Sequence, residues 1–518
     1  MNRPVSSLVQ LDPRDNVAVA KQQVSRGARV PIGDSSHQLA VRETVEFGHK
    51  LALQDIQESQ PILKFGQVIG FASQDIRCGE WVHVHNVCLG ELKLDYAFGS
   101  AVPAEPAPLQ PRTFQGYRRA NGRAATRNYV ALISTVNCSA TASKYVAQGI
   151  DPRILEKYEN VDGIVPLVHK GGCAFEYDGF DHRQLARTLA GFANHPNIGA
   201  YLILGLGCET SQAGFLTDQY NLVQLDVPGE AMETLPLVMN IQEQGGVART
   251  VDRAIGVLND LLPEANRVCR EPIPVAELIV ANECGGSDAN SGITANPAVG
   301  VASDRLVAHG ATTMLAETPE IFGAEHLLTR RAVTSAVAEK LIERIRWWED
   351  YARKFGVEID NNPSVGNKKG GLTTIYEKSL GAIAKGGSTA LKAVYEYAEP
   401  VTESGLIVMD TPGFDPASVT GMVAGGANIV VFTTGRGSCF GCKPVPTIKV
   451  ASNTPMYERM EADMDINAGR ILDGASVAEV GEEILDKIIA VASGEQTKSE
   501  AQGIGDEEFC PWVSGPVL

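Results

Sequence analysis

The sequence predicts an α/β protein with largely parallel sheets, preceded by a small and mainly β module. Two observations support this class. Glycine is abundant, with 52 among 518 residues, whereas aromatic residues make up only 6%, a composition that favours many tight turns between strands and helices. From about residue 114 onward, continuous apolar runs alternate with amphipathic segments, as in sheets that helices cover on both faces. A chain of this length exceeds what one core accommodates, so we expect several domains.

The first hundred residues predict the β module. Short apolar segments separated by turn residues occur at 16–20, 68–72 and 81–85, and this close spacing is typical of small β domains. We therefore expect an N-terminal domain at 1–100. The following stretch, 101–113, is rich in proline. Because proline is incompatible with a helix interior, this stretch predicts a stiff, extended linker.

The remainder predicts two α/β domains. A central domain at 114–397 holds most of the candidate site residues, and a C-terminal domain follows at 398–518. The segment 334–355 has the pattern of an amphipathic helix. The candidate strands lie at 128–135, 163–169, 200–206, 222–227, 278–281, 312–316, 406–410 and 429–433.

The charge balance argues against two classes of partner. Lys and Arg number 45 against 62 Asp and Glu, giving a formal net charge of −17, which disfavours nucleic acid and anionic membranes. No stretch approaches the roughly 20 apolar residues of a membrane span, and the polar start lacks a signal-peptide core, so we expect a cytoplasmic protein. Ten cysteines in so long a chain do not indicate a disulfide framework. For oligomeric state, a homodimer is the most common case and our expectation.

Four cysteines directly follow predicted strands: Cys138, Cys173, Cys208 and Cys284. Ligands of open α/β sheets bind at the C-terminal ends of the strands. Thiolates together with an imidazole, here His169, suit iron or zinc. A single free cysteine is more often an inert buried residue, but four at equivalent positions favour a metal site.

The run 283–288, Glu-Cys-Gly-Gly-Ser-Asp, places a thiol, a hydroxyl and a carboxylate after an apolar segment. A capped turn before a helix is the alternative interpretation. Glu209 follows the sequence Gly-Leu-Gly-Cys at 205–208, which lacks the third glycine of a dinucleotide-binding loop. We therefore expect Asp288 and Glu209 to be polar groups of the site and expect no nicotinamide cofactor.

Two further segments predict contacts with an anionic ligand. Gly435 and Arg436 follow a predicted strand, and a guanidinium beside glycine amides suits a carboxylate or a phosphate. A solvated turn arginine is the alternative. The polar loop 362–371 offers Asn367 and Lys368 to an acidic ligand, or it is only a connector.

The N-terminal module also carries candidates. His83 and His85 alternate on a predicted strand and would face one side, where they would contact metal or substrate. Surface histidines are the alternative, and for His49 a surface position is the commoner case. Cys439 and Cys442 form a CxxC pair without the second pair that a zinc site needs, so redox chemistry and loop packing both stay open.

Taken together, these segments resemble the altronate/galactarate dehydratase family of sugar-acid hydro-lyases over the full chain. The family implies a SAF-like β-clip domain at the N-terminus, followed by Rossmann-like α/β domains. The matching segments are 48–50, 83–86, 116–122, 127–128, His169 with Cys173, 205–209, 283–288, 294–297, Glu317 with Glu320, 362–368, 434–437 and 464–469.

The resemblance implies dehydration of an aldonate or aldarate to a 2-keto-3-deoxy sugar acid with a divalent metal, Fe²⁺ or alternatively Mn²⁺. The His-x-His-Asn pattern at 83–86 is similar to the altronate branch, so we expect altronate as substrate, with galactarate or another sugar acid as the alternative. Cys439 and Cys442 depart from the family's pattern after the Gly-Arg-Gly turn. A non-catalytic sugar-acid-binding protein and a thiol oxidoreductase built on that pair are alternatives of other classes.

Such a dehydration needs a base for the proton α to the carboxylate and a cation against the developing charge. We expect the N-terminal module to close over the site as a lid on the stiff linker. The expected catalytic residues are His169, His49, Asp288 and Glu209. The expected substrate-binding residues are Arg436, Lys368, Asn367, Gly435, His83, His85 and Asn296. The expected metal ligands are Cys138, Cys173, Cys208, Cys284 and His169.

Overall fold

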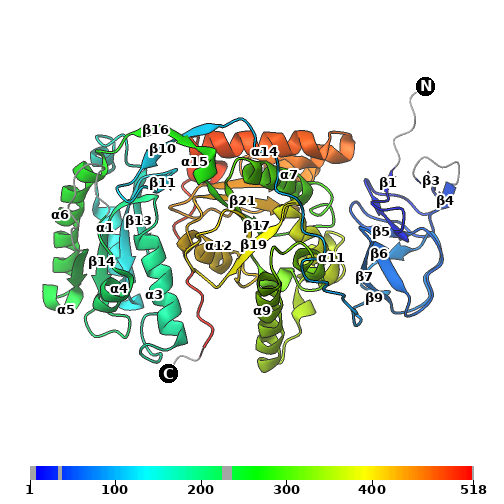
Figure 1. Ribbon diagram of the computed structural model, residues 1–518, viewed down its shortest axis with the longest axis horizontal. Coiled ribbons are helices and arrows are strands. Elements are labelled where there is room, and N and C mark those ends of the chain that lie inside the picture. The colour runs from blue at the N-terminus through cyan, green and yellow to red at the C-terminus, as the bar shows by residue number, and fades with distance from the viewer. Residues whose placement is uncertain (1–6, 33–37, 225–235, 516–518) are drawn as a thin grey trace.

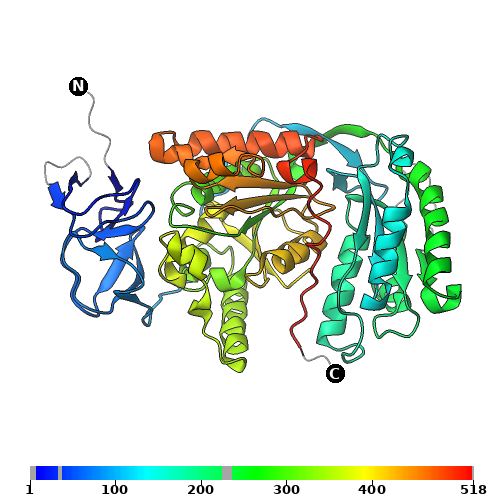
Figure 2. The ribbon, with the colours of Figure 1, turned by 180° about the vertical axis from the view of Figure 1, so that it is seen from behind.

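The computed structural model describes residues 7–32, 38–224 and 236–515. Three parts lie in a row, with the N-terminal domain at one end, the C-terminal domain in the middle and a second domain at the other end (Figure 1). Seen from behind, the C-terminal tail runs between the middle and the second domain (Figure 2). The C-terminal domain therefore contacts both of the others.

The N-terminal domain consists of short antiparallel strands, which confirms the predicted β module. Its strands are β1 (Leu8–Val9), β2 (Val17–Ala20), β3 (Arg29–Pro31), β4 (Gln38–Ala40), β5 (Lys50–Ala52), β6 (Pro61–Lys64), β7 (Gln67–Ala72), β8 (Trp81–Val82) and β9 (Val87–Cys88). They form a sheet in the order β1-β2-β5-β8, a second in the order β6-β7-β9, and the hairpin β3-β4.

The predicted strand at 81–85 is shorter than expected, since β8 ends at Val82. The amide of His83 donates to Oδ1 of Asn86 at 2.9 Å, and the amide of Asn86 donates to the carbonyl of His83 at 3.0 Å. These two bonds close a turn. His83 and His85 therefore lie in a turn and do not alternate along a strand.

The second domain has a four-stranded parallel sheet in the order β13-β12-β14-β15. Of the predicted strand at 222–227, residues 222–224 form no strand and the others lie outside the described residues. The strands are β12 (Tyr129–Ser134), β13 (Gly163–Leu167), β14 (Ile198–Gly205) and β15 (Leu237–Asn240), and the helices are α1 (Asn137–Gly149), α2 (Pro152–Leu155), α3 (Phe180–Ala193), α4 (Ala213–Tyr220), α5 (Ile241–Gln244) and α6 (Val247–Ala265).

The C-terminal domain has a seven-stranded parallel sheet in the order β19-β20-β18-β17-β21-β22-β23. Its strands are β17 (Ile279–Cys284), β18 (Thr312–Leu315), β19 (Leu391–Tyr395), β20 (Gly405–Met409), β21 (Ile429–Thr434), β22 (Thr447–Ala451) and β23 (Ile466–Asn467). Its α-helices are α7 (Ala295–Ala308), α8 (Glu325–Thr329), α9 (Ser335–Lys354), α10 (Val365–Lys369), α11 (Ile375–Ala382), α12 (Asp415–Ala424), α13 (Thr454–Arg459), α14 (Val477–Ala492) and α15 (Lys498–Ala501).

Successive residues of β17 serve the two faces of this sheet. Val280 packs with α7 and α14 on one face, whereas Ala281 packs with α12 on the other, next to the second domain. This alternation follows from the two-residue period of a strand. Both faces are covered, which explains why β17 and β21 each begin with a continuous apolar run in the sequence.

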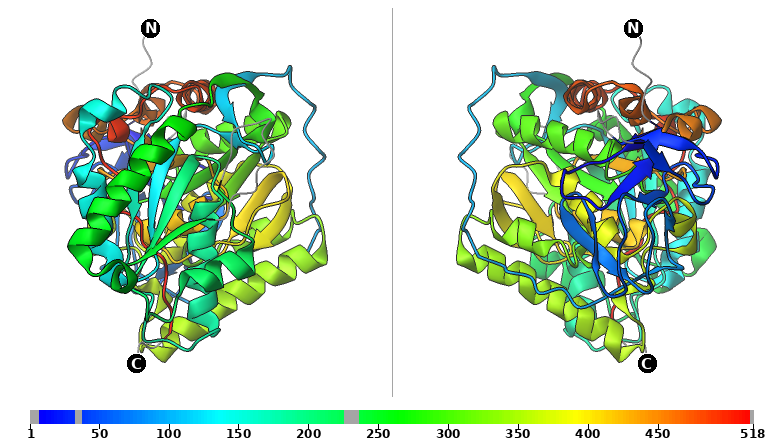
Figure 3. Two further views of the ribbon diagram at one scale, coloured as in Figure 1. Left: turned by 90° about the vertical axis from the view of Figure 1, so that its left-hand side faces the viewer. Right: turned by 90° about the vertical axis from the view of Figure 1, so that its right-hand side faces the viewer.

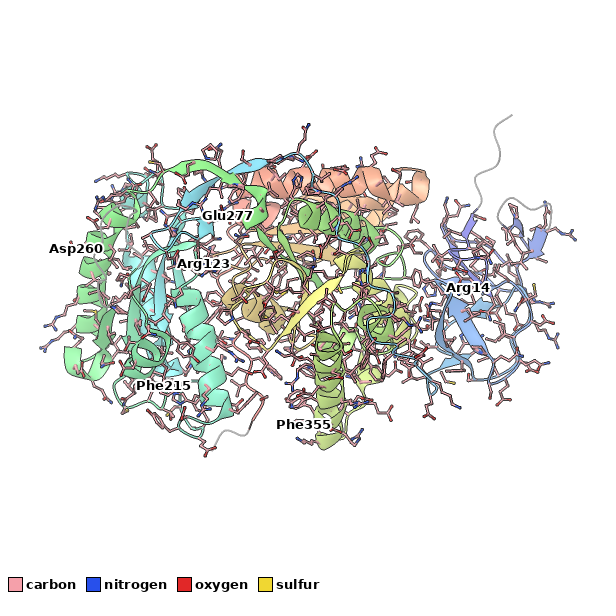
Figure 4. All side chains as sticks on the ribbon, in the orientation of Figure 1. Arg14, Arg123, Phe215, Asp260, Glu277 and Phe355 are labelled. Carbon is pink, nitrogen blue, oxygen red and sulfur yellow. The ribbon has the colours of Figure 1, made fainter. Side chains whose placement is uncertain are left out.

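The expected boundary at 397–398 does not separate two sheets. It falls between β19 and β20, which are hydrogen-bonded neighbours. The chain changes sheet much earlier, at a small antiparallel sheet of β10 (Thr113–Arg118), β11 (Ala124–Ala125) and β16 (Arg270–Pro274). This ribbon leads into and out of the second domain. Near it, Arg118 pairs with Glu277 at 2.9 Å, and Figure 4 labels Glu277 and Arg123 beside this junction.

The N-terminal domain is packed on the C-terminal domain. Ile62 and Ile69 share one apolar cluster with Leu328 and Leu380. The linker residues 101–112 form neither helix nor strand, and they run as an extended segment along the edge of the molecule (Figure 3). The N-terminal domain is thus held by a shared core, and not, as the lid expectation assumed, by the linker alone.

A buried histidine joins the second and C-terminal domains. Nε2 of His195 donates to the carbonyl of Ala427 at 2.9 Å, and Nδ1 accepts the amide of Asn197 at 3.0 Å. Burial, together with the nearby charge of Arg123, lowers the pKa of His195 to about 3. This histidine is therefore neutral in the folded protein.

None of the described helices is both long enough and apolar enough to cross a membrane.

This neutral histidine predicts acid sensitivity. Its pKa in the folded state lies below the unfolded value of about 6.5, so its contribution to stability is complete above pH 6.5 and is lost as the pH falls toward 3. At pH 5 the loss is about 2 kcal/mol. We expect His195→Gln to reduce the difference in urea stability between pH 7 and pH 5. The same change at the exposed His85 should leave that difference as in the wild type, and an undiminished difference in His195→Gln would contradict the assignment.

Candidate active site

The C-terminal ends of β17 and β18 lie at the sheet edge next to the N-terminal domain. Beside the end of β17 is a small cavity of about 10 Å³, lined among others by Lys64 of the N-terminal domain and by Cys284, Asp288 and Lys378 of the C-terminal domain. The two domains therefore share one site. Because this edge is where open parallel sheets bind ligands, the cavity marks the candidate active site.

A group of ionisable side chains lies beside this cavity, and we call it the Cys284 cluster. The thiol of Cys284 donates to Oε2 of Glu317 at 3.3 Å and to Oε2 of Glu320 at 3.5 Å. Nζ of Lys385 lies 2.9 Å from Oε2 of Glu317, and Lys378 pairs with Glu320. The members of the cluster are Glu283, Cys284, Glu317, Glu320, Lys378, Lys385 and Asp415.

Local backbone structure fixes these groups. Glu317 follows β18 with a φ of +58°, a conformation that costs energy for a residue other than glycine, and its amide donates to Oγ1 of Thr411 at 2.8 Å. Gly285 follows β17 where a Cβ atom would lie 2.1 Å from Oδ2 of Asp415, so only glycine fits there. Lys378 stands on α11, whose N-terminus is capped by Thr374. Backbone strain and close approach are typical of functional sites.

The cluster perturbs the protonation of its members. Burial, and then the charge of Glu317, raises the pKa of Glu283 well above its ordinary value and does the same to the thiol of Cys284. Burial and the charges of Glu317 and Glu320 raise the pKa of Asp415 to about 7. Although burial opposes ionisation of Glu317, the ammonium groups of Lys385 and Lys378 keep its pKa below the ordinary value. Perturbed groups of this kind gather at functional sites.

Several buried polar atoms around the site have no hydrogen-bond partner among the described residues. They include Oε1 of Glu283 and of Glu317 in the cluster, and Nδ1 of His83, Oγ of Ser287 and Oδ1 of Asn290 at the domain boundary. Leaving such an atom unpaired costs about 1–3 kcal/mol. Their concentration here indicates a place that a ligand or an ion completes.

Asp288 has a positioning role in the structure. Its Oδ1 accepts the amide of Ser291 at 2.8 Å and the hydroxyl of Ser452 at 2.7 Å, while its Oδ2 accepts the side chains of Asn290 and Asn453 at 3.2 and 3.1 Å. The carboxylate thus ties its own loop to the segment that follows β22. Asp288 lines the cavity, but its two carboxylate oxygens already accept hydrogen bonds from the protein.

The anion-binding groups expected at Gly435 and Arg436 are only partly free to bind a ligand. The amides of Gly435 and Arg436 both donate to the carbonyl of Gly286, at 3.0 and 2.7 Å, so they are not free for a ligand. The guanidinium of Arg436 is exposed beside Gly370. Lys368 lines another hollow with Asp360.

Two asparagines predicted to bind substrate are internally paired. The side chain of Asn367 donates to the carbonyl of Ser287 at 2.8 Å. Asn296 donates to the carbonyl of Gly381 at 2.9 Å and accepts the hydroxyl of Thr433 at 2.7 Å. Asn296 lines the cavity, whereas Asn367 supports the loop above it.

Three histidines of the N-terminal domain gather around Trp81. Nδ1 of His49 accepts the indole N–H of Trp81 at 3.1 Å, and its Nε2 donates to the carbonyl of Lys369 at 3.2 Å. The ring of His83 stacks on Trp81 with centroids 5.1 Å apart, and the ring of His85 lies 4.9 Å from the same indole. Burial, followed by the charge of Lys50, lowers the pKa of His83 to about 3. His49 is a domain contact, and His83 keeps one buried nitrogen without a partner.

The remaining expected ligands belong to the other sheet. Cys138, Cys173 and Cys208 are exposed and follow strands of the second domain, so they do not join Cys284. His169 is also in that domain. Its Nε2 bonds the carbonyl of Ser134 at 2.9 Å, its Nδ1 accepts the amide of Gly171 at 3.1 Å, and burial lowers its pKa to about 4.

The carboxylate of Glu209 is hydrogen-bonded to its own and a neighbouring loop. Its Oε1 accepts the hydroxyl of Thr135 at 2.6 Å and the amide of Leu206 at 3.1 Å, and its Oε2 accepts the amide of Gly207 at 2.6 Å. The backbone amides at this strand end therefore already hold a carboxylate. The five expected metal ligands are thus divided between two sheet edges, because the sequence does not show which strands share a sheet.

Four residues of the site were not predicted from the sequence: Lys378, Lys385, Lys64 and Glu377. Lys378 and Lys385 lie on short helical segments, where a lysine is normally solvated. Glu377 accepts the ammonium groups of Lys64 and Lys50 at 2.8 Å each, and all three side chains are buried. A usable signal was present only for Glu317 and Glu320, which follow a predicted strand as Cys284 does.

Comparison with known proteins agrees with this architecture. Three family models match consecutive parts of the chain: the altronate/galactarate dehydratase SAF domain at 6–89, the second domain of D-galactarate dehydratase/altronate hydrolase at 116–266, and the C-terminal domain of D-galactarate/altronate dehydratase at 275–517. Each range corresponds to one of the three parts in Figure 1.

Full-length relatives show the same relationship. Altronate dehydratase of Bacillus subtilis (strain 168) is 35% identical over 99% of this chain and 100% of its own length. Altronate dehydratase of Escherichia coli (strain K12) is 35% identical over 98% and 99%, respectively. Galactarate dehydratase (L-threo-forming) of the same strain is 38% identical over 97% and 96%. The chain therefore belongs to the altronate/galactarate dehydratase family and is an enzyme of the hydro-lyase class.

Proposed function

We propose that the protein dehydrates altronate to its 2-keto-3-deoxy acid, with galactarate or another sugar acid as the alternative substrate. Family membership supports a sugar-acid dehydratase. The observation that supports a location for the reaction is the Cys284 cluster, in which two ammonium groups, a thiol and four carboxyl groups lie beside one cavity. These are the groups that proton removal next to a carboxylate requires.

In this proposal, a cation of the N-terminal domain holds the substrate carboxylate. Lys64 lines the cavity from that domain and Lys378 lines it from the C-terminal domain, so the ammonium group of Lys64 meets the carboxylate of an acid bound between them. The unpartnered hydroxyl of Ser287 lines the same cavity and bonds a substrate hydroxyl. A cavity of about 10 Å³ holds about one water molecule. Binding of a sugar acid therefore requires its wall to move.

We assign proton transfer to members of the Cys284 cluster. Nζ of Lys378 pairs with Glu320, donates to Oδ1 of Asn362 at 2.9 Å and lines the cavity. We assign Lys378 the proton that the leaving hydroxyl receives. Glu283 and Glu317 each keep one unpartnered carboxylate oxygen, and they are the candidates for accepting the α proton.

The family resemblance also implies a divalent metal, and the cluster fits one. Cys284, Glu317 and Glu320 each offer a ligand atom, and these atoms lie within 4.8 Å of one another. Thiolate and carboxylate ligands suit Fe²⁺ or Mn²⁺. When bound, such an ion supplies Lewis-acid stabilisation of the developing negative charge.

The substrate assignment is tested with the purified full-length protein. Incubation with altronate and, separately, with galactarate should yield a 2-keto acid that semicarbazide detects by its absorbance. We expect the larger kcat/KM with altronate. A larger value with galactarate would replace altronate by the alternative, and no 2-keto product from any aldonate or aldarate would contradict the proposal.

The metal assignment predicts loss of turnover on dialysis against a chelator. Readdition of Fe²⁺ or Mn²⁺ should restore it, and a Glu317→Gln variant should retain less bound metal by elemental analysis. Full activity after complete metal removal would contradict the assignment.

The proposal also includes a homodimer and a cytoplasmic location. Light scattering of the full chain tests whether the protein is a homodimer.

A further inference from the structure

Three cysteines occupy equivalent positions at the second domain's sheet edge. Cys138 follows β12, Cys173 follows β13 and Cys208 follows β14, and these three strands are neighbours in the order β13-β12-β14. All three thiols are exposed. We infer that they form a binding site for an iron–sulfur cluster, separate from the Cys284 cluster and independent of the proposed dehydration.

Backbone contacts bring the three cysteine loops together. The amide of Asn137, next to Cys138, donates to the carbonyl of Gly171 at 3.0 Å, and the amide of Ser211 donates to the carbonyl of Gly172 at 3.0 Å. Gly172 lies so close to the first loop that a Cβ atom there would be 2.3 Å from the carbonyl of Thr135. One loop with its cysteine at 173 thus contacts both of the others.

The three thiols are not arranged for a single ion. Among the described residues, these three sulfur atoms do not form a set that lies within 4.8 Å of one another. A single tetrahedral ion with bonds of about 2.3 Å would draw its sulfur ligands closer than that. In a four-iron, four-sulfide cluster each cysteine binds a different iron atom, so the sulfur atoms stand farther apart. A cavity of about 670 Å³ opens at this edge, and of the three cysteines Cys173 alone lines it, beside Asn137 and His169.

The surroundings of the thiols suit an anionic centre. Cys138 is in the first turn of α1, which has no acidic residue there, and the positive end of a helix dipole attracts negative charge. Lys170 lines the cavity. Nε2 of Gln242 donates to Sγ of Cys208 at 3.3 Å, and hydrogen bonds to ligand sulfur atoms are a usual feature of iron–sulfur sites. Glu209, the nearest acid in sequence to Cys208, is turned toward its own loop amides.

The test uses the full-length protein, purified without oxygen or reconstituted with ferrous iron and sulfide. We expect iron and acid-labile sulfide in comparable amounts, together with the broad visible absorption of an iron–sulfur centre. Cys138→Ser, Cys173→Ser and Cys208→Ser should each lower both contents severalfold. Cys269→Ser changes a cysteine that is also exposed but lies elsewhere, and it should keep the wild-type contents.

Two outcomes would overturn the inference. One is a reconstituted protein that holds no sulfide, whether it binds a lone metal ion or nothing. The other is equal loss in Cys269→Ser and in the three site variants. Circular dichroism of each variant reports whether it is folded. Glu317→Gln should keep the iron–sulfur content, so failure of the proposed dehydratase site and failure of this inference give different results.

Discussion

Replacing Glu377 by glutamine is expected to loosen the N-terminal domain from the rest of the molecule and to reduce turnover strongly. Glu377 is the counter-charge for Lys50 and Lys64, each 2.8 Å away, and all three side chains are at most 1% exposed. Although burial favours the neutral acid, the two ammonium groups hold the pKa of Glu377 far below its ordinary value. Glu377→Gln leaves two buried charges unpaired, which costs about 3–5 kcal/mol.

The consequence is measurable at the domain boundary. We expect a lower unfolding temperature, faster hydrogen exchange in residues 61–72 and faster proteolysis of the linker at 101–112. Adding Lys64→Met to the variant should recover part of the loss, because one unpaired charge is removed. Glu495→Gln, at a partly exposed acid paired with Lys487, is the matched control and should change none of these readouts. Wild-type proteolysis and exchange in Glu377→Gln would refute the role.

Replacing Lys378 by methionine is the second large effect we expect. Methionine keeps the length and the apolar stem of the side chain but removes the ammonium group that pairs with Glu320 and lines the cavity. Loss of a general acid or of a preorganised cation lowers kcat by roughly 100- to 1,000-fold. We expect the decrease in kcat to exceed any change in KM, since the proton of Lys378 is used in the chemical step.

A buried lysine elsewhere provides the control. Lys449 is fully buried and donates to the carbonyl of Phe440 at 3.0 Å, away from the cavity. Lys449→Met should lower stability but leave kcat within severalfold of the wild type. If both methionine variants lose turnover equally at equal stability, Lys378 has no specific role in the reaction.

The sequence was informative about strands and their ends. Cys284 was predicted to lie at a functional strand end, and the structure places it beside the cavity. The apolar runs of β12, β17 and β21 were recognised because both faces of their sheets are covered. Periodicity reports burial, and in this protein it located the strands from which the site is built.

The same patterns could not show how strands are distributed between sheets. Cys208 and Cys284 follow similar apolar runs, yet they belong to different domains. Buried ion pairs were missed for a related reason. A lysine such as Lys385 looks solvated in a one-dimensional pattern, and only the fold reveals the acid, here Glu317, that makes its burial tolerable.

The contact between Lys50 and Glu377 also orders events during synthesis. These residues are 327 positions apart in the chain, so at roughly 5–20 residues per second the ribosome completes the second about 16–65 s after the first. During that interval the strands of the N-terminal domain have been synthesised, but Glu377, the partner of its two lysines, has not. The apolar residues of the C-terminal domain that share its core are also still missing. The part of the protein that is made first is therefore among the last to reach its final place.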